Sequence, residues 1–476
     1  MRSRAPRLSA GVSQSKTCSQ HRHYIEPVTE AGTTITRTDS PDAEIVYRKI
    51  AWRIMPFLVL LFVVAWLDRI NVGFARLQMV KDLRFTDAEY GFGAGIFYLG
   101  YLLFEVPSNL LLERIGARKT FARITILWGC TSIATMFVKT PGGFYLVRFL
   151  LGAFEAGLLP GAVLYLTYWF PARRRGQMVG LFLAAIPIAG VLGGPLSGWI
   201  MASTGGRAGL ANWQWVFLLE GIPSIAMGLL TFKVFTDNPT QARWLTDAEK
   251  RHVRADLETD HRDAGHRPHG FVEALKLPQM WLLTLIQFCL TSANPTFGFW
   301  GPTIIEGLGV RSNSTIGLLS AIPNIAAVTC LIYVGRHSDR TLERRYHAAV
   351  LCLASAAGLA LIGVFSNHPA FAFAALILGT TGGVSAGAPF WQFPPMLLAG
   401  TAAAGGIALI NSIGSFSGWV APFAVGWLRD VTGKTSSGLY VVAALEVLGA
   451  LLILLFMPRR SSKRPAETGR ELATGV

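Results

Sequence analysis

Charge is what this sequence has least of. Only 15% of its 476 residues are Asp, Glu, Lys or Arg, whereas a soluble globular chain has about 25%. Hydrophobic residues make up 51% of the chain, and its mean hydropathy is +0.42. This composition argues against a soluble protein and indicates that most of the chain lies in a membrane.

Cysteine is also scarce, and the five cysteines show no pattern of a site. No CxxC motif or Cys/His ligand spacing occurs, so neither a disulfide framework nor a zinc site is indicated. The apolar runs also contain no nucleophile–base pair and no phosphate-binding loop. We therefore expect no enzyme activity, no metal and no cofactor.

The first residues lack the apolar core of a signal peptide. Residues 1 to about 44 are polar, and they are basic at their start. We expect a disordered cytoplasmic tail over residues 1–48, or in part a translation start that was assigned too early. The sequence leaves both interpretations open.

Long apolar runs are what the sequence has instead. Each run has about 20 residues, enough for a helix to cross a hydrocarbon core of about 30 Å. They predict an all-α membrane protein with twelve transmembrane helices, in two six-helix halves at 49–235 and 277–458. A polar cytoplasmic linker is expected at 236–276 and a tail at 459–476. The expected spans are 52–75, 89–112, 121–138, 144–170, 176–201 and 213–235, then 278–305, 314–335, 347–366, 370–392, 401–428 and 438–457.

The net charge of +15 comes from loops and tails, not from one patch with interleaved aromatics. This distribution argues against a nucleic-acid partner. The basic segments fall on one side of the predicted spans, and the opposite loops carry few basic residues, which is the positive-inside pattern. Both termini are therefore expected in the cytoplasm, with the chain in a plasma membrane. The basic segments are the N-terminal tail, 114–123, 173–175, the linker, 336–345 and 459–464.

The two predicted halves share a repeated feature. The turn after the second span contains Glu113-Arg114, and the turn after the eighth contains Asp339-Arg340. The fifth and eleventh spans both carry small residues spaced by four and a proline, which allow close helix packing. Two similar halves around a central cavity are the architecture of an alternating-access transporter.

Charged residues inside the spans point to the purpose of that cavity. Arg148 and Glu155 are seven residues apart, which places them on one helical face about 10 Å apart. Each charge costs about 2.5–3.5 kcal/mol at the centre of a membrane helix, so both are expected to face a protein-lined or water-lined interior. Asp68 and Arg69 lie in the first span. Two guanidinium groups can hold a carboxylate, and carboxyl groups removed from water take up protons more readily.

A structural alternative stands beside this functional one. Asp68 with Arg69, and Arg148 with Glu155, could be ion pairs that only hold their helices together.

Several motifs resemble those of the major facilitator superfamily. The turns at 113–118 and 335–340 resemble its cytoplasmic gating motif, although Asn109 and Glu113 replace the usual glycine and aspartate. Arg148-x-x-x-Gly152 resembles its motif in the fourth helix. Further segments are similar to the anion:cation symporter branch, which carries tartrate, phthalate, sugar acids and hydroxyphenylacetate. They are Asp68-Arg69-Ile-Asn71, Phe104-Glu105-Val-Pro107-Ser108-Asn109, Phe299-Trp300-Gly-Pro302-Thr303, 338–345, Pro389-Phe390-Trp391 and 406–412.

The resemblance implies roles for matching residues. It assigns Arg69 and Arg148 to substrate binding and Asp68 and Glu155 to proton coupling. It places a gate at Glu113, Arg114, Arg118, Asp339 and Arg340. Further cavity candidates are polar or aromatic residues on cavity-forming helices, namely Tyr101, Asn294, Trp391 and Asn411, with Gln287, Gln392 and Ser412. Glu105 is open between a gating role and a proton role.

The function expected from these features is import of an organic carboxylate with a proton. The partners would be a small organic anion and the lipid bilayer, and the protein would be a monomer. An exporter of hydrophobic compounds with the same fold is the alternative, and sodium coupling also stays open. Which carboxylate is carried, and whether Asp68 or Glu155 is the main proton carrier, the sequence leaves undecided.

Overall fold

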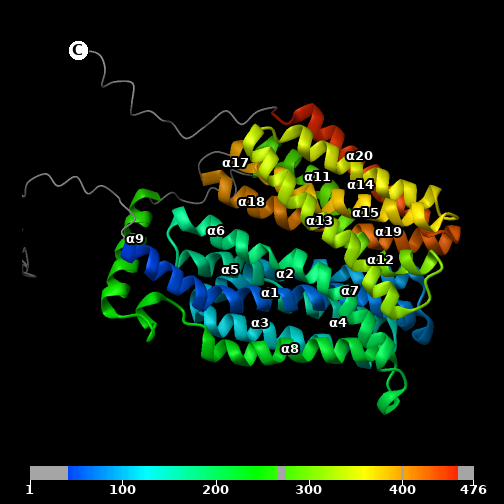
Figure 1. Ribbon diagram of the computed structural model, residues 1–476, viewed down its shortest axis with the longest axis horizontal. Helices are drawn as coiled ribbons and strands as arrows, with labels where there is room; N and C mark the ends of the chain where they lie inside the picture. Colours follow the sequence, from blue (N-terminus) through cyan, green and yellow to red (C-terminus); the bar gives the residue numbers. More distant parts are fainter. Residues whose placement is uncertain (1–40, 265–274, 398–400, 459–476) are drawn as a thin grey trace, which may run out of the picture.

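The computed structural model describes residues 41–264, 275–397 and 401–458, and these residues form helices joined by short turns (Figure 1). The prediction of an all-α fold is confirmed for this part of the chain. Figure 1 shows α1 to α8 packed as one half and α11 to α20 as another, with α9 at one end. We refer to these as the N-terminal and C-terminal halves.

The N-terminal half contains long helices, several of them interrupted. Ala156 and Gly157, the latter with φ of 90°, separate α4 from α5 directly after Glu155. The helices of this half are α1 (Pro41–Leu83), α2 (Asp87–Ile115), α3 (Ala117–Ala134), η1 (Thr135–Phe137), α4 (Pro141–Glu155), α5 (Leu158–Thr167), α6 (Ala172–Leu183), α7 (Ala185–Ser203), η2 (Arg207–Gly209) and α8 (Asn212–Val234).

The C-terminal half also contains interrupted helices. Ser292 separates α11 from α12, and residues 415–416 separate α18 from α19. The helices are α11 (Pro278–Thr291), α12 (Ala293–Gly307), α13 (Asn313–Thr341), α14 (Arg345–Val364), α15 (Pro369–Ser385), α16 (Gly387–Phe390), α17 (Phe393–Leu397), α18 (Thr401–Gly414), α19 (Ser417–Thr432) and α20 (Thr435–Phe456).

The start of α1 differs from the sequence prediction. The helix begins at Pro41, inside the segment 1–48 that was expected to be a disordered tail. The difference arises because Tyr47 is buried and its hydroxyl donates to Asp256 of α9 at 3.0 Å. The expected linker at 236–276 is also partly helical, because it contains η3 (Pro239–Gln241) and α9 (Asp247–Ala264).

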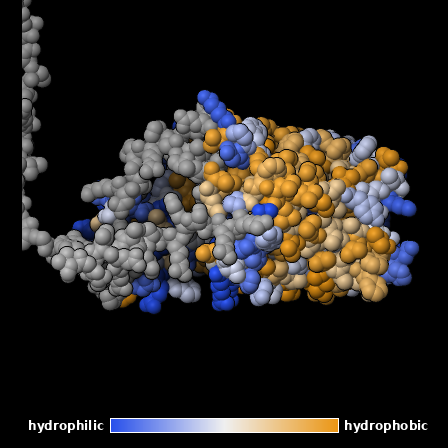
Figure 2. Space-filling model, turned by 90° about the horizontal axis from the view of Figure 1, so that it is seen from above, coloured by the Kyte–Doolittle hydropathy of each residue, from blue (hydrophilic) through white to orange (hydrophobic). Residues whose placement is uncertain are grey.

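The surface of the bundle is that of a multi-pass membrane protein. Nine helical segments in the described ranges are long and apolar enough to cross a membrane. Figure 2 shows orange, hydrophobic side chains over most of the body, with blue, hydrophilic ones towards its ends. Large apolar side chains such as Trp199, Phe232 and Leu455 are 46–72% exposed, as expected for contact with lipid. The twelve-helix count and the orientation of the termini stay predictions.

The two halves pack closely through small residues. A methyl group added to Gly194 of α7 would lie 2.6 Å from the carbonyl oxygen of Gly317 on α13, and one added to Gly426 of α19 would lie 2.1 Å from that of Asp87. Only glycine allows the backbones to approach this closely. One buried apolar cluster continues across this boundary, because it contains Val72 of α1 and Trp300 of α12.

Candidate functional site

An ion pair between Arg69 and Glu155 joins α1 to α4. Glu155 is buried, and the side chain of Arg69 is 12% exposed. The Arg69 guanidinium lies 4.5 Å from the ring centre of Trp66, 4.9 Å from that of Phe97 and 5.5 Å from that of Tyr101. Such contacts stabilise a cation by about 0.5–2 kcal/mol each. The structure thus brings three predicted residues, Arg69, Glu155 and Tyr101, together.

Arg148 lies next to this pair but is not neutralised. It is 0% exposed, and its Nη2 donates to the carbonyl oxygen of Ala94 at 3.2 Å. Its Nε and Nη1 have no hydrogen-bond partner within the described residues. The guanidinium lies between the rings of Phe97 and Phe299, at 5.3 and 5.8 Å from their centres. A buried charge without a counter-ion is strongly unfavourable, so this group is suited to binding an anion.

The position of Arg148 follows from its neighbour one turn along α4. Gly152 lies against α2 so closely that a methyl group there would be 2.0 Å from the carbonyl oxygen of Phe97. Close contact of α4 with α2 brings Arg148 and Phe97 to the same place. The Arg-x-x-x-Gly motif therefore has a packing reason as well as a chemical one.

Asp68 faces a different side of α1 from Arg69, towards α3 and α8. Its carboxylate accepts hydrogen bonds from Trp128 Nε1 at 2.7 Å, Ser132 Oγ at 2.8 Å and Ser224 Oγ at 2.5 Å. Asn71 Nδ2, one turn along α1, donates at 3.5 Å. Asp68 is 1% exposed. When it is ionised, its negative charge is stabilised by these neutral hydrogen-bond donors and not by a cation.

These contacts correct both pairings that the sequence suggested. Asp68 is not paired with Arg69, and Arg148 is not paired with Glu155; the described residues contain the crossed pair Arg69–Glu155 instead. Successive residues on a helix point about 100° apart, so Asp68 and Arg69 face different neighbours.

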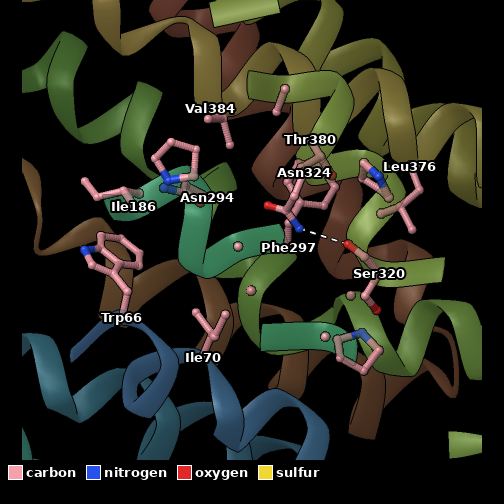
Figure 3. A pocket seen from close by; sticks show the side chains of 18 of the residues that line it. Trp66, Ile70, Ile186, Asn294, Phe297, Ser320, Asn324, Leu376, Thr380 and Val384 are labelled. Carbon is pink, nitrogen blue, oxygen red and sulfur yellow. Dashed lines mark hydrogen bonds between the residues drawn. The ribbon is translucent and has the colours of Figure 1, made fainter. Parts of the chain in front are cut away.

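A pocket between the two halves is lined by α1, α7, α12, α13 and α15 (Figure 3). Asn294 lines it, as do Trp66 and Asn324, whose Nδ2 donates to the carbonyl oxygen of Ser320 at 2.9 Å. Trp66 also lies against Arg69, so it connects the pocket to the Arg69–Glu155 pair. Of the predicted substrate residues in the C-terminal half, Asn294 is the one placed here.

The other two C-terminal candidates lie elsewhere. Trp391 packs on Phe390, with 5.4 Å between ring centres, outside the residues that line this pocket. Asn411 is half-buried on α18. Its neighbour Ser412 instead donates to Glu105 Oε2 at 2.8 Å and so joins the two halves.

The predicted gate residues do not close the end of the bundle near α9. Glu113, Arg114 and Arg340 are exposed, and no ion pair joins them to any residue that the structure describes. The backbone N–H of Arg118 donates to Asp237 Oδ1 at 2.8 Å, beside the turn at Gly116. The side chain of Asp339 lies outside the described residues.

The opposite end is closed by a cluster that sequence reasoning missed. Asp87 forms ion pairs with Arg76 and with Arg429, the latter at 3.3 Å. Arg76 Nη1 donates to Thr303 Oγ1 at 2.7 Å, and Asp430 accepts from the backbone N–H of Asp87 at 3.0 Å. We call these five residues the Asp87 latch; it joins α1 and α2 to α12 and α19. In the sequence, the signal that could have revealed this cluster is the unusual charge of the loop after the first expected span.

Two buried acids were also missed. Glu220 on α8 and Glu446 on α20 are 4% and 0% exposed. Each is a lone acid in an apolar span, which is a signal that sequence reasoning could have used. No group of three His, Cys, Asp or Glu that could hold a metal ion occurs among the described residues.

Comparison with known proteins identifies the family of this chain. The profile of the Major Facilitator Superfamily matches residues 58–422. A candidate tartrate transporter of Agrobacterium vitis is 44% identical over 426 residues, 89% of this chain and 93% of its own length. A quinolone resistance transporter of Acinetobacter baumannii is 40% identical over 408 residues, 86% of this chain and 94% of its own.

The fold is also that of solved transporters. The crystal structure of a D-xylose-proton symporter superposes with a TM-score of 0.70 and 13% identity, covering 87% of this chain and 99% of that chain. At this identity the likeness concerns the fold alone. Together with the match over residues 58–422, these similarities show that the chain belongs to the major facilitator superfamily, a family of membrane transporters.

Proposed function

We propose that this protein imports an organic anion, a carboxylate, by proton symport through alternating access. The observation that carries the proposal is the guanidinium of Arg148, which is buried and has two unpartnered nitrogen atoms in the described structure. A carboxylate supplies both a negative charge and acceptor oxygens for such N–H groups. Its binding would remove the cost of the uncompensated charge.

The relatives support the substrate class. The chain is 44% identical over most of its length to a protein named as a candidate tartrate transporter, and tartrate is a dicarboxylate. The pocket beside Trp66 adds apolar walls and the amides of Asn294 and Asn324, which would bind the rest of the substrate. These features favour a small organic acid over an inorganic anion.

Proton coupling would act through the Arg69–Glu155 pair. A proton that binds the Glu155 carboxylate neutralises it and breaks the ion pair. The freed Arg69 guanidinium then takes the carboxylate of the substrate as its new partner. Proton and anion are thus bound together, because each makes the site of the other favourable. Asp68 would serve as a further proton carrier on the other face of α1.

Alternating access would use the two ends of the bundle. The Asp87 latch holds the halves together at one end, whereas the predicted gate residues at the α9 end make no pairs across the halves in the described structure. In a second conformation the latch would part and the gate residues would pair. We place the latch outside the cell, the termini in the cytoplasm, and twelve spans in the bacterial inner membrane.

The test begins with purified protein and a thermal-shift screen of carboxylates, with tartrate first. Uptake of the strongest ligand into proteoliposomes is then measured with an inward proton gradient, without sodium. Accumulation should follow the gradient and collapse with a protonophore. Accumulation that is independent of the proton gradient but requires sodium would show that sodium is the coupling ion. A screen in which no carboxylate binds would contradict the proposal.

Export of hydrophobic compounds is the second candidate, favoured by the similarity to a quinolone resistance transporter. Growth separates the two functions. Cells that express the protein would gain growth on a carboxylate as carbon source if it imports, and would gain resistance to toxic hydrophobic compounds if it exports. Loss of the growth gain in Arg148→Gln would tie import to the site described above.

A further inference from the structure

Glu220 lies in a polar compartment that the site described above does not use. It is 4% exposed on α8, and Ser197 Oγ of α7 donates to its Oε1 at 2.7 Å. Its Oε2 has no hydrogen-bond partner among residues 41–264, 275–397 and 401–458. A carboxylate with one bare oxygen in the interior is unfavourable. The environment of Glu220 therefore favours the form that carries a proton.

This compartment also contains Asp68. Glu220 and Ser224 are one turn apart on α8, and Ser224 Oγ donates to Asp68 Oδ2 at 2.5 Å. Asn71 lies one turn from Asp68 on α1, donates to its Oδ1 at 3.5 Å, and lies beside Glu220. The two acids thus occupy neighbouring levels between α1 and α8. Glu220 is on the side of the Asp87 latch, because Asn71 is nearer than Asp68 to the end of α1.

The charges around the two acids are few. In the described structure, Asp68 is the ionisable group that faces Glu220 from α1, while α3 and α7 present Ser132 and Ser197. Glu155 on α4 is a further ionisable group near Asp68, and Arg69 follows Asp68 in the chain. No cation contacts either carboxyl group within the described residues. Two negative charges at this distance from water repel each other strongly. We therefore expect at most one of the two acids to be ionised at a time.

The hydrogen-bond inventory leads to the same result. Asp68 receives donors from Trp128, Ser132 and Ser224. Of the carboxyl and amide oxygen atoms of Asp68, Asn71 and Glu220, those left without a donor from the described residues are Glu220 Oε2 and Asn71 Oδ1. A proton on Glu220 supplies one donor to this group of acceptors and removes the second charge. With Asp68 ionised, the compartment therefore accommodates one proton, on Glu220.

We propose that Glu220 and Asp68 form a proton-exchanging pair, in which Glu220 is a further proton-binding residue on the latch side. In the exchange, the O–H bond of Glu220 breaks and a new one forms on Asp68, directly or through water. Glu220 becomes a carboxylate as Asp68 becomes a carboxylic acid, so the compartment keeps its net charge. This inference rests on the proposed proton symport, for which Glu220 would connect Asp68 to the latch end.

Infrared spectroscopy of the purified full-length protein tests the pair without a substrate. The carbonyl stretching band of protonated carboxyl groups is recorded as a function of pH for the wild type, Glu220→Gln, Asp68→Asn and Ser197→Ala. Glu220→Gln should remove one component of the band and move the pH midpoint of the remaining component by about one unit or more. Ser197→Ala should keep the component but shift its frequency, because Oε1 loses its donor.

Two results would overturn the proposal. One is an unchanged band in Glu220→Gln; the other is a Ser197→Ala spectrum identical to the wild type, which stays informative if the first variant does not fold. Transport then separates this inference from the proposed function. If wild-type uptake ignores the proton gradient, symport is wrong. If Asp68→Asn loses accumulation while Glu220→Gln retains it, symport holds and the pair is wrong.

Discussion

The two halves of the molecule treat buried charge in opposite ways. In the N-terminal half, Asp68, Glu155 and Glu220 each have a hydrogen-bond or ion-pair partner, and Arg148 lies close to Glu155. In the C-terminal half, Glu446 is 0% exposed and neither of its carboxyl oxygens has a partner among the described residues. The structure thus contains a connected set of charges on one side and an isolated acid on the other.

This difference indicates that the two halves have different roles in transport. A charge can move only where other groups stabilise it in each position, and the N-terminal half provides such groups. An isolated acid in an apolar place is stable only when neutral. We therefore expect the N-terminal half to couple the proton to the anion. The C-terminal half would shape the pocket through α12, α13 and α15.

The largest effect is expected from Glu155→Gln. The variant keeps the shape of the side chain but cannot exchange a proton, so proton-driven accumulation in proteoliposomes should fall at least about 10-fold. Exchange of internal for external substrate should continue within about twofold, because exchange needs no net proton movement. Glu258→Gln, on the exposed face of α9, is the control. A variant that still accumulates substrate like the wild type would contradict the role of Glu155.

The Asp87 latch should give the next largest effect, because its ion pairs join the two halves at one end of the bundle. Asp87→Asn weakens ion pairs with both Arg76 and Arg429. The latched state should become less populated, by about 10-fold for each 1.4 kcal/mol lost. The measurement is the rate at which a membrane-impermeant thiol reagent labels Ala421→Cys, which is 1% exposed on α19.

Its control is Lys81→Gln at the same end. Lys81 is 3.8 Å from Glu306 but 76% exposed, and such surface pairs contribute little. Labelling should therefore rise in Asp87→Asn and stay unchanged in Lys81→Gln. Equal rates in the two variants would mean that the latch does not hold the halves together.

A smaller effect is expected from the pocket in the C-terminal half. Asn294→Ala removes a polar group from the pocket, so the apparent KM should rise by about 5–10-fold with little change in kcat, the cost of about one hydrogen bond. Asn411→Ala, which lies outside the residues that line this pocket, should change KM less than twofold. The opposite ranking of the two variants would place the substrate nearer to α18.

The smallest effect is expected from Glu446→Gln. If this acid stays neutral, an amide of the same shape should leave proton-driven accumulation within about twofold of the wild type. Glu220→Gln, at a connected site, should not. Loss of accumulation in Glu446→Gln would show that charge movement extends into the C-terminal half, and the division between the halves would then fail.

The sequence was sufficient for the features that depend on one helix. The apolar runs predicted the all-helical membrane fold, and the spacing of Arg148 and Glu155 predicted that both are held inside the protein. Both are indeed buried. The similarity to the superfamily was also visible in the motifs at 113–118 and 148–152.

The partners of these residues could not be predicted in the same way. Which side chain Asp68 or Arg69 meets depends on how α1 rotates against α3, α4 and α8, and neighbouring residues in the sequence do not encode that rotation. The Asp87 latch joins residues more than 340 positions apart. Glu220 differs from these residues, because a lone acid in an apolar span is visible in the sequence without knowledge of its partners.

The most direct test of the account is the affinity of a carboxylate for the protein with and without Arg148. Calorimetric titration of the strongest ligand from the screen is carried out on the wild type, Arg148→Gln and the loop variant Arg207→Gln. We predict that Arg148→Gln weakens binding at least about 100-fold, because the substrate loses its charged partner, and that Arg207→Gln binds like the wild type. Equal affinity of Arg148→Gln and the wild type would contradict the account.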